Sequence, residues 1–593
     1  MSNKTTYPPA FAKPIELRDF SKGRITKYSV NPFLIPKNSV SDCMNVNFDT
    51  IIGSGVVRQG TLALGSVIAS NKTPLGFTNL VGAGGSPNLL LAVLNGASTA
   101  SLYYFDTSWH TSTVTNLTND NKVRFAQLGN RVYRASVDGM LGSSDGNNWD
   151  YVNTPAYPTS SSDGTQWEQV IPSLVFRAKS RLLVGGNTNF YGISKDRIYF
   201  STVINKSQIK KTVTTLTNLG SNTFDVVCIA HGFSTGDSVT ITGASPSTYN
   251  TTGRVSTILN ANEFYIKVYE NPVSSPATGT IYIAYADIGF NTDTVKGDWI
   301  DINPDDGGTV TAFGETSNQT IVFKNNGMYR LDVITKSVDV QNIFNIGAQA
   351  QEGVITCQGV CYFFSGIDIR MTDGGYPTQI SRLGVQDYID AIPQSYWTNV
   401  AAGTDGFNVY FSIGNITLNT NKNNQKSYTN VVLKFSPRDE SWSVHSYAQQ
   451  PRFFTSYTTT TGLEMTSLDS SGFAQVFNSG HTDNGSEIFY NLETQDVDFG
   501  NRAHSNSFND KIAVFCTDGA GSQLQARADD GDYKDITDTL QLPVNVVDGL
   551  DHDGHYFTFK WFGSTKTSSP VFDGLYMANI TDDGLTMTNA DGQ

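Results

Sequence analysis

Two parts of the sequence carry residue types that bind metal ions. His552, Asp553 and His555 lie close together in GLDHDGHYF, and imidazole with carboxylate suits zinc and similar ions. Two acidic loops, NPDDGG (303–308) and RADDGDYKDITD (527–538), offer the carboxylates that calcium prefers, at Asp305, Asp306, Asp529, Asp530 and Asp532. Neither loop has the ligand order of an EF-hand, and Asp-Gly is typical of a tight hairpin. We therefore interpret all three segments as polar turns and expect no metal or cofactor.

A second group of turns combines an acidic or small residue, a tight polar stretch and a tryptophan that opens the next strand. These turns surround Trp109, Trp149, Trp167, Trp299 and Trp442. An Asp in such a turn accepts backbone hydrogen bonds and Gly allows positive φ, as at Asp145 with Gly146 and at Asp163 with Gly164. The tryptophan can then pack between neighbouring sheets. The pattern predicts structural anchors.

Two of these turns, SSDGNNW (143–149) and SSDGTQW (161–167), resemble the Asp-box of sialidases and other propeller glycosidases, shortened by one residue. The resemblance implies a structural turn away from an active site, so it favours a propeller without indicating catalysis. A sialidase-like site also needs clustered arginines with a tyrosine and an acid. The sequence alone does not assemble such a cluster from Arg131, Arg134, Arg181 and Arg370. We expect no enzymatic activity.

Composition limits the classes of partner and fold. The 593 residues include 40 Lys and Arg against 54 Asp and Glu, so the net charge is −14, which disfavours high-affinity nucleic-acid binding through the whole surface. Only 16% of the residues are charged, whereas 54 are Gly, 34 Phe and 27 Tyr, a balance that favours β structure. Five cysteines are too few for a disulfide framework, so we expect buried thiols. Without a signal peptide or a long apolar run, we expect neither export nor a membrane span.

Short runs of β-branched and aromatic residues alternate with Gly, Asn and Asp turns, and helical periodicity is short. The sequence therefore predicts an all-β fold built around an irregular β-propeller. The expected parts are an extended N-terminal docking arm (1–60), the propeller (61–207 and 287–490), an inserted small β-barrel (208–286) and a C-terminal β module that closes or flanks the propeller (491–593). The propeller is expected to be irregular, because Trp149 and Trp167 lie too close for successive blades. A tandem of β-sandwiches is the alternative.

The segment 31–65 has a Pro-flanked stretch, then Asn-Val, a Gly and Arg-x-Gly. The matching positions are Pro36, Ser41, Asn45, Val46, Gly53 or Gly55, Arg58 and Gly60. This order resembles the start of a group of bacteriophage tail and portal-associated proteins. Segments 299–333, 360–381 and 493–515 resemble successive later parts of the same proteins, and the block with His231-Gly232-Phe233 resembles small β domains of phage structural proteins.

The resemblance implies a structural component of a short phage tail, either a nozzle or a portal plug, made in the host cytoplasm and located in the virion. Its partners would be copies of itself in a ring, expected to be a hexamer, together with adaptor or portal-associated proteins and tail fibres or spikes. Double-stranded DNA would pass through without sequence-specific binding, because an acidic lumen repels it. The alternative is a receptor-binding or glycan-processing tail protein on a β-propeller. A bacterial surface-associated binding protein is a third possibility.

Overall fold

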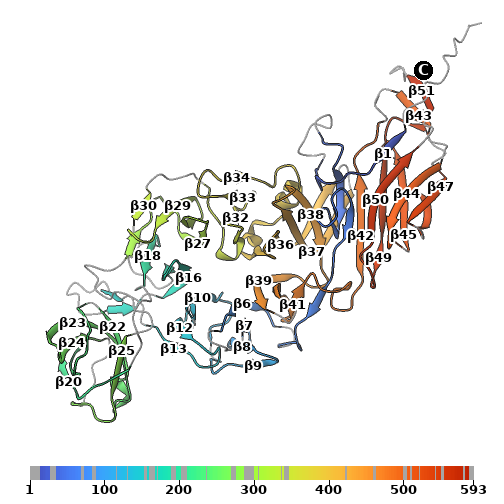
Figure 1. Cartoon of the computed structure of the whole chain (residues 1–593). Coiled ribbons are helices and arrows are strands. Elements are labelled where there is room, and N and C mark those ends of the chain that lie inside the picture. The colour runs from blue at the N-terminus through green and yellow to red at the C-terminus, as the bar shows by residue number, and fades with distance from the viewer. Residues whose placement is uncertain are drawn as a thin grey trace, which may run out of the picture. The chain divides into compact units, whose positions relative to one another are not determined.

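The structure is a computed structural model in which almost every regular element is a β-strand (Figure 1), so the predicted all-β class is confirmed. It describes residues 14–585 apart from residues 27–34, 69–71, 83–87, 115–116, 130, 153–155, 159–166, 170, 188–194, 202–209, 236, 269–274, 286–298, 305, 336, 340–345, 421–423, 459–461, 499–503, 508–510, 520, 530, 541–542, 549–552 and 578–580. Its helical elements are the α-helix α1 (Gln386–Asp390) and the 3-10 turns η2 (Ser247–Tyr249), η3 (Gln351–Gly353) and η4 (Gln394–Asn399). No helix within the described ranges is long and apolar enough to cross a membrane.

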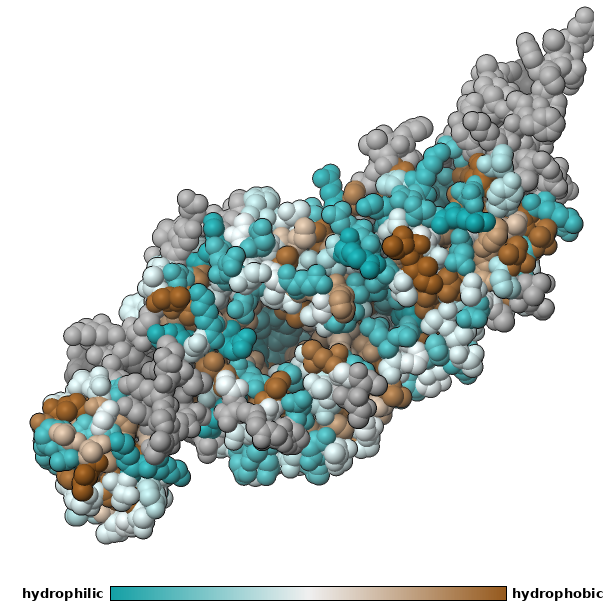
Figure 2. All heavy atoms as spheres, in the orientation of Figure 1, coloured by the Kyte–Doolittle hydropathy of each residue, from teal (hydrophilic) through white to brown (hydrophobic). Residues whose placement is uncertain are grey.

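The chain divides into two compact units, which we describe separately. The middle unit is Thr73–Gln351, and the terminal unit combines Met1–Lys72 with Glu352–Gln593. Figure 2 shows hydrophilic and hydrophobic residues interspersed on the visible surface, with the hydrophobic side chains in small separate groups. That distribution is ordinary for a folded protein surface.

Four antiparallel four-stranded sheets follow one another in the middle unit. The first holds β6 (Pro74–Leu80), β7 (Leu89–Leu94), β8 (Ser101–Phe105) and β9 (Trp109–Thr111). The second holds β10 (Arg124–Leu128), β11 (Arg131–Ser136), β12 (Gly139–Ser143) and β13 (Asp150–Tyr151). The third holds β16 (Pro172–Ala178), β17 (Arg181–Asn187), β18 (Arg197–Phe200) and β26 (Trp299–Asp301), and the fourth holds β27 (Val310–Glu315), β28 (Thr320–Lys324), β29 (Gly327–Asp332) and β30 (Ser337–Asp339). A separate ladder joins β14 (Ala156–Pro158) to β15 (Trp167–Gln169).

These sheets share hydrophobic cores with their neighbours. Leu91 and Val132 belong to one core between the first two sheets, and Ile198 packs with Val322 between the third and the fourth. A strand in a sheet covered on both faces is apolar throughout, and β7 is buried at all six positions. The sequence favours one buried face for such strands, so the continuous burial of β7 differs from that expectation.

Three more four-stranded sheets lie in the terminal unit. They hold β31 (Val354–Cys357), β32 (Val360–Phe364), β33 (Ile369–Thr372) and β34 (Thr378–Gln379); β35 (Ala401–Thr404), β36 (Val409–Thr420), β37 (Asn424–Ser436) and β38 (Ser441–Ser446); and β39 (Pro451–Thr458), β40 (Leu463–Asp469), β41 (Ala474–Phe477) and β5 (Thr61–Ala63). Ring contacts such as Tyr362 with Phe435, at 6.2 Å between centroids, join successive sheets. Cys357 packs in this interior, and both Cys357 and Cys361 are buried and outside any disulfide, as the sequence predicts.

Four-stranded meanders are the building blocks of propeller blades. The hairpin predicted from QTIVFK, Asn-Asn and GMYRLD is confirmed by the pairing of β28 with β29 from Lys324 and Gly327 outward. The propeller itself stays a prediction, since it also requires the sheets to close into a ring.

The chain segment that connects strands β18 and β26 of the third sheet forms a separate seven-stranded sheet. Its strands are β19 (Lys211–Thr212), β20 (Thr215–Gly220), β21 (Thr223–Val227), β22 (Ser238–Thr242), β23 (Thr252–Asn260), β24 (Glu263–Lys267) and β25 (Tyr282–Tyr285). It has its own core, in which the His231 ring lies 4.5 Å from that of Phe264 and Tyr249 packs on Phe224. His231 is therefore a core residue of this insertion, and the closure of its sheet into a small β-barrel stays a prediction.

The remaining strands of the terminal unit build two facing sheets and a small third one. One sheet is β3 (Val46–Asn47), β4 (Gly55–Val57), β50 (Val571–Met577), β44 (Lys511–Thr517) and β47 (Val544–Asp548), with β1 (Ile15–Leu17) also on β50. The other is β2 (Val40–Met44), β42 (Ile488–Thr494), β49 (Phe557–Thr565), β45 (Ser522–Ala528) and β46 (Lys534–Leu540). The third joins β48 (Asp553–Gly554), β43 (His504–Ser507) and β51 (Thr581–Leu585). Trp561 from one facing sheet and Phe572 from the other stack at 5.3 Å in the shared core.

The N-terminal segment differs from the docking arm that the sequence predicts. Strand β2 pairs with β42 and β4 pairs with β50, both within the same chain. The described part of residues 1–60 therefore belongs to the terminal unit, and its docking on a neighbour stays a prediction. The physical reason is that its alternating apolar residues, such as Val40 and Val46, fill the core between the two facing sheets.

Candidate functional site

The N-terminal motif forms a buried polar clamp in the terminal unit. The Arg58 guanidinium is 1% exposed and donates to both carboxylate oxygens of Asp483, at 2.8 and 2.6 Å. Its Nε donates to Asn45 Oδ1 at 2.8 Å, and the guanidinium carbon lies 3.9 Å from the centre of the Tyr447 ring. These contacts join the N-terminal strands to the chain beyond residue 446. The clamp is a structural feature.

The other motif residues also serve this packing. Asn45 has a φ of 60° and donates to the Phe489 carbonyl at 2.6 Å. A Cβ at Gly60 would lie 1.9 Å from the Thr482 carbonyl oxygen, and one at Gly55 would lie 2.6 Å from a Leu492 methyl carbon, so both positions need glycine. Pro36 contributes a carbonyl that accepts from the Ser39 hydroxyl at 2.6 Å.

The turn at Asp145 has the structure that its sequence predicts. The Asp145 carboxylate accepts from the backbone N–H groups of Asn147 and Asn148, at 2.9 and 2.7 Å. Burial opposes the charge, but these bonds and the Asn148 amide hold the pKa of Asp145 below its ordinary value. Gly146 has a φ of +70° and its carbonyl accepts from Trp149 Nε1 at 3.0 Å.

The other tryptophan anchors occupy different settings. Trp442 is buried and donates to the Ile380 carbonyl at 2.9 Å. Trp299 lies under the Arg197 guanidinium, whose carbon is 3.5 Å from the ring centre. Trp167 is in strand β15, whereas Asp163 and Gly164 lie outside the described residues.

The four arginines considered for a sialidase-like site are each held on their own sheet. Arg131 and Arg181 donate to the carbonyls of Gly142 and Ser201, at 2.8 and 2.7 Å. Arg134 donates to the Ser136 hydroxyl at 2.8 Å, and Arg370 pairs with Asp368 at 2.6 Å. Each of these arginines therefore has a partner within its own sheet, and these contacts do not bring the four together.

The acidic loop around Asp306 contains a cation of its own. The Lys324 ammonium, 0% exposed, pairs with Asp306 and with Asp196 at 2.8 Å, and donates to the Ile302 carbonyl at 3.1 Å. Lysine thereby occupies the position where calcium could bind. Asp305 lies outside the described residues.

The candidate ligands near the C-terminus form a turn. His555 Nδ1 lies 3.4 Å from Asp529 Oδ2, and the Asp529 carboxylate accepts from the His555 N–H at 2.9 Å. Asp532 and Asp553 are exposed, while Asp530 and His552 are not described. Across the described ranges, no group of three or more His, Cys, Asp or Glu residues is placed to hold a metal ion.

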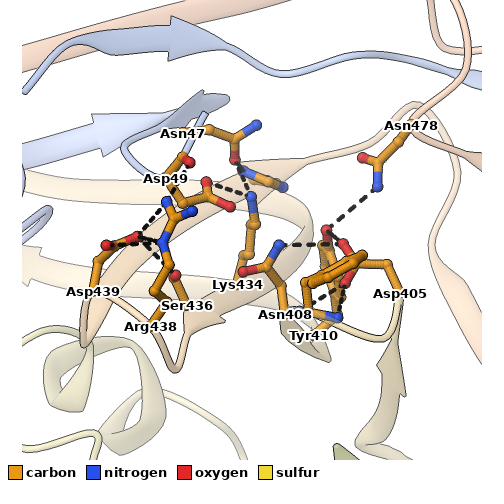
Figure 3. A network of polar contacts seen from close by, with 12 residues as sticks. Asn47, Asp49, Asp405, Asn408, Tyr410, Lys434, Ser436, Arg438, Asp439 and Asn478 are labelled. Carbon is orange, nitrogen blue, oxygen red and sulfur yellow. Dashed lines mark hydrogen bonds and ion pairs between the residues drawn. The ribbon is translucent and has the colours of Figure 1, made fainter. Parts of the chain in front are cut away.

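A polar network connects strand β3 to the sheet that contains β37 and β38 (Figure 3). Figure 3 shows Lys434 pointing toward Asn47 and Asp49, with Lys434 Nζ 2.7 Å from Asp49 Oδ1. His445 Nε2 donates to Asn47 Oδ1 at 2.9 Å and is fully buried. Burial, with Arg58 and Lys434 nearby, lowers the pKa of His445 well below its usual value. The folded protein thus keeps this imidazole neutral.

The neutral His445 predicts a pH dependence of stability. The unfolded chain binds a proton at this position below about pH 6.5 and the folded protein does not, so the free energy of unfolding falls as pH falls, by up to about 1.4 kcal/mol per pH unit. We expect His445→Gln, which keeps a donor for Asn47, to flatten the dependence between pH 6.5 and 5. Urea unfolding of the wild type and the variant at a series of pH values measures the free energy of unfolding. An unchanged slope in the variant would assign the dependence to other groups.

The outward face of the sheet β2-β42-β49-β45-β46 carries a set of side chains that sequence analysis did not single out. We call two cross-strand rows of this sheet the polar-aromatic face. Its residues are Asn491, Phe562 and Gln523 in one row and Glu493, Lys560 and Gln525 in the other. Directly opposed residues of antiparallel strands have Cβ atoms about 5 Å apart, so each row is continuous. All six are half-buried, while the alternate residues Leu492, Trp561 and Leu524 point into the core.

Aromatic and charged groups border this face. Phe489 lies on β42 two residues before Asn491 and is 67% exposed. Arg527 Nη2 lies 3.2 Å from Glu493 Oε1, and its guanidinium carbon is 4.9 Å from the centre of the Tyr533 ring. The Lys560 ammonium lies 5.4 Å from the centre of that ring and 5.3 Å from that of Phe562. The face therefore presents rings, amides and charges on rigid strands.

Burial and neighbouring charges alter the ionisation of this face. Burial, and then the charge of Lys426, lower the pKa of Lys560. Burial and the carboxylate of Glu493 raise the pKa of Tyr533, so its hydroxyl stays protonated. Asp42 pairs with Lys426 at 3.2 Å at the edge of the face and is the cross-strand partner of Glu493. An array of amides and ring faces of this kind can hold a sugar, whose hydroxyls need donors and acceptors and whose C–H faces pack on rings.

No family model matches the sequence, and no curated protein matches it. Among solved structures, the chain is similar to "Phage phi92 endosialidase" at 11% identity and a TM-score of 0.18, covering 97% of this chain and 78% of that one. It is also similar to a structure titled "Glycoside hydrolase" at 10% identity and a TM-score of 0.21, covering 87% of this chain and 99% of that one. Both titles name enzymes, which contradicts the prediction that the chain is not an enzyme, and we withdraw that prediction. Likenesses this low supply no activity in its place.

Proposed function

We propose that the protein binds carbohydrate on the polar-aromatic face and acts as a receptor-binding component of a phage tail. The observation that carries the proposal is the register of β42, β49 and β45, which places Asn491, Phe562 and Gln523 in one row. Sugar sites combine an apolar ring surface with a few fixed polar groups. The tail assignment rests on the resemblance of residues 31–65 to phage tail proteins.

Glycan binding tests the proposal directly. The full chain is applied to an array of bacterial surface polysaccharides, and affinity for each bound glycan is measured by calorimetry. We expect Phe562→Ala to weaken binding about tenfold, because the variant removes the central ring of the face. Phe407→Ala is the matched control, since Phe407 is 73% exposed on a hairpin between β35 and β36. Equal affinity of wild type and Phe562→Ala would contradict the assignment to this face. Release of reducing ends from a bound glycan would show processing in addition to binding.

A tail nozzle is the second candidate. The net charge of −14 favours it, because a negatively charged channel lets DNA slide. We propose in that case a ring, expected to be a hexamer, with adaptor or portal-associated proteins as neighbours. Electron microscopy of the purified protein tests this, since closed rings support the nozzle and trimers support the receptor-binding protein.

A further inference from the structure

We propose that the polar-aromatic face binds two consecutive sugar rings of a neutral glycan, one on Phe562 and one on Phe489. This inference rests on the proposed function, and it identifies the class of the ligand and a second position that binds a sugar ring. It depends on which side chains of the face are already engaged within the chain and which are open to a ligand.

The amides on either side of Phe562 are open to a ligand. Asn491 of β42 and Gln523 of β45 are the cross-strand partners of Phe562 in β49, so Phe562 lies between them in the row. Neither side-chain amide makes a hydrogen bond to another described residue, and none of their polar atoms is buried without a partner. An amide offers both donors and an acceptor, and a sugar hydroxyl can use either. The aromatic ring and the two amides can therefore hold one sugar unit.

Phe489 provides the second aromatic ring. It lies on β42 two residues before Asn491, it points away from the core as Asn491 does, and it is 67% exposed. Its cross-strand partner is Ser564, two residues beyond Phe562 on β49, so the two phenylalanines are diagonal neighbours on one face. Diagonal neighbours on paired strands lie about 7–8 Å apart, which is of the same order as the length of one sugar unit in a glycan chain. The Asn45 amide donates to the Phe489 carbonyl at 2.6 Å and so fixes the backbone at this position.

The charges on the Lys560 side of the face compensate one another. Glu493 contacts Arg527 at 3.2 Å and is the cross-strand partner of Lys560. The Asp535 carboxylate accepts from the Gln525 amide at 2.8 Å and adds a second negative charge. Two cations therefore meet two carboxylates, and their charges sum to 2 − 2 = 0.

Two further ion pairs border the face and are balanced in the same way. Lys426 lies 3.2 Å from Asp42 at one edge, and Lys566 lies 3.1 Å from Glu487, two residues before Phe489. An ionised ligand would find no uncompensated charge among these groups to attract it. Open amides beside exposed rings, in contrast, suit a neutral sugar, whose hydroxyls need donors and acceptors.

The number of sugar units tests the two-ring site. The full chain is titrated in a calorimeter with glucose, mannose and the cello-, malto-, laminari- and mannooligosaccharides of two to four units, and with fragments of one to four units from any other neutral glycan that it binds. In at least one series we expect the disaccharide to bind about tenfold more tightly than the monosaccharide, and the third unit to add less than about threefold. Equal affinity for one unit and two, or a larger gain at the third unit than at the second, would overturn the two-ring site but leave the proposed function intact.

A second comparison tests whether the ligand is neutral. We expect the affinity for the neutral glycan to be the same at about 0.05 and 0.5 M salt, because no ion pair with the ligand is screened. Polygalacturonate and colominic acid are compared with their carboxyl-reduced forms, and we expect the reduced forms to bind at least as tightly. Tighter binding of the charged form would overturn the neutral class and leave the proposed function intact. Binding of no glycan of either kind would overturn both.

Variants locate the second sugar ring. We expect Phe489→Ala to remove most of the gain from one unit to two and to leave the affinity for the monosaccharide unchanged. Gln523→Leu should weaken binding of both by about three- to tenfold, because it removes the amide beside Phe562. Phe407→Ala is the matched control, since Phe407 is 73% exposed on a different sheet of the same unit. Urea unfolding confirms that each variant is folded. An unchanged gain in Phe489→Ala would contradict the assignment of the second sugar to Phe489.

Discussion

Arg58→Ala is expected to lower the free energy of unfolding of the terminal unit by about 3–5 kcal/mol, because the variant leaves the Asp483 carboxylate buried without its partner. Asp483 is itself 4% exposed, and Arg58 is its bidentate donor. The variant also leaves Asn45 Oδ1 without its hydrogen bond from Arg58. The midpoint of urea unfolding, followed by tryptophan fluorescence, measures the loss.

Arg58→Lys separates charge from geometry. A lysine keeps the charge but has no planar fork for two oxygens, so we expect only partial recovery. The control is Arg438→Ala, since the Arg438 side chain is 65% exposed and pairs with its neighbour Asp439. That control should leave the midpoint unchanged. A midpoint for Arg58→Ala equal to that of the control would show that the clamp does not stabilise the N-terminal strands.

Lys324→Ala is expected to destabilise the middle unit by a similar amount, about 3–5 kcal/mol. The side chain is fully buried with two carboxylates, Asp196 and Asp306, facing its ammonium. Alanine leaves both of them with no cation. The loss should appear as a lower urea midpoint for the transition of this unit.

Removing the carboxylates together with the lysine tests whether charge is the cause. In the triple variant Lys324→Met with Asp196→Asn and Asp306→Asn, no ion remains buried, so we expect most of the stability to return. Lys566→Ala, which breaks an exposed pair with Glu487, is the control and should be neutral. A triple variant as unstable as Lys324→Ala would assign the loss to packing.

Local signals in the sequence predicted local structure well. The turn at Asp145 was predictable because its donors, Asn147 and Asn148, lie within three residues. The hairpin of β28 and β29 follows from its Asn-Asn turn in the same way. Turn chemistry of this kind depends on a few adjacent residues, which one sequence contains in full.

Features formed by distant segments were not predictable. Arg58 could be singled out by its motif, but Asp483 could not be identified as its partner from one sequence. The polar-aromatic face was missed because Asn491, Gln523 and Phe562 become neighbours only through the pairing of three strands. A useful signal was present, since the outward positions of SQLQARA are Gln, Gln and Arg. The same limit applies to the strand pairing of residues 40–57, because partners such as Gly55 and Phe572 are distant in the chain.

N-terminal strands pair with C-terminal strands in the terminal unit, and this pairing determines which unit can fold first during translation. Strand β4 can pair with β50 only after β50 has been translated, near the end of synthesis. The strands of the middle unit, in contrast, are all present once residue 351 has left the ribosome. Contacts between distant residues form slowly because the intervening loop must close first. The N-terminal strands are therefore made early and are the last to find their partners, and during translation their apolar residues are the ones that most need protection from aggregation.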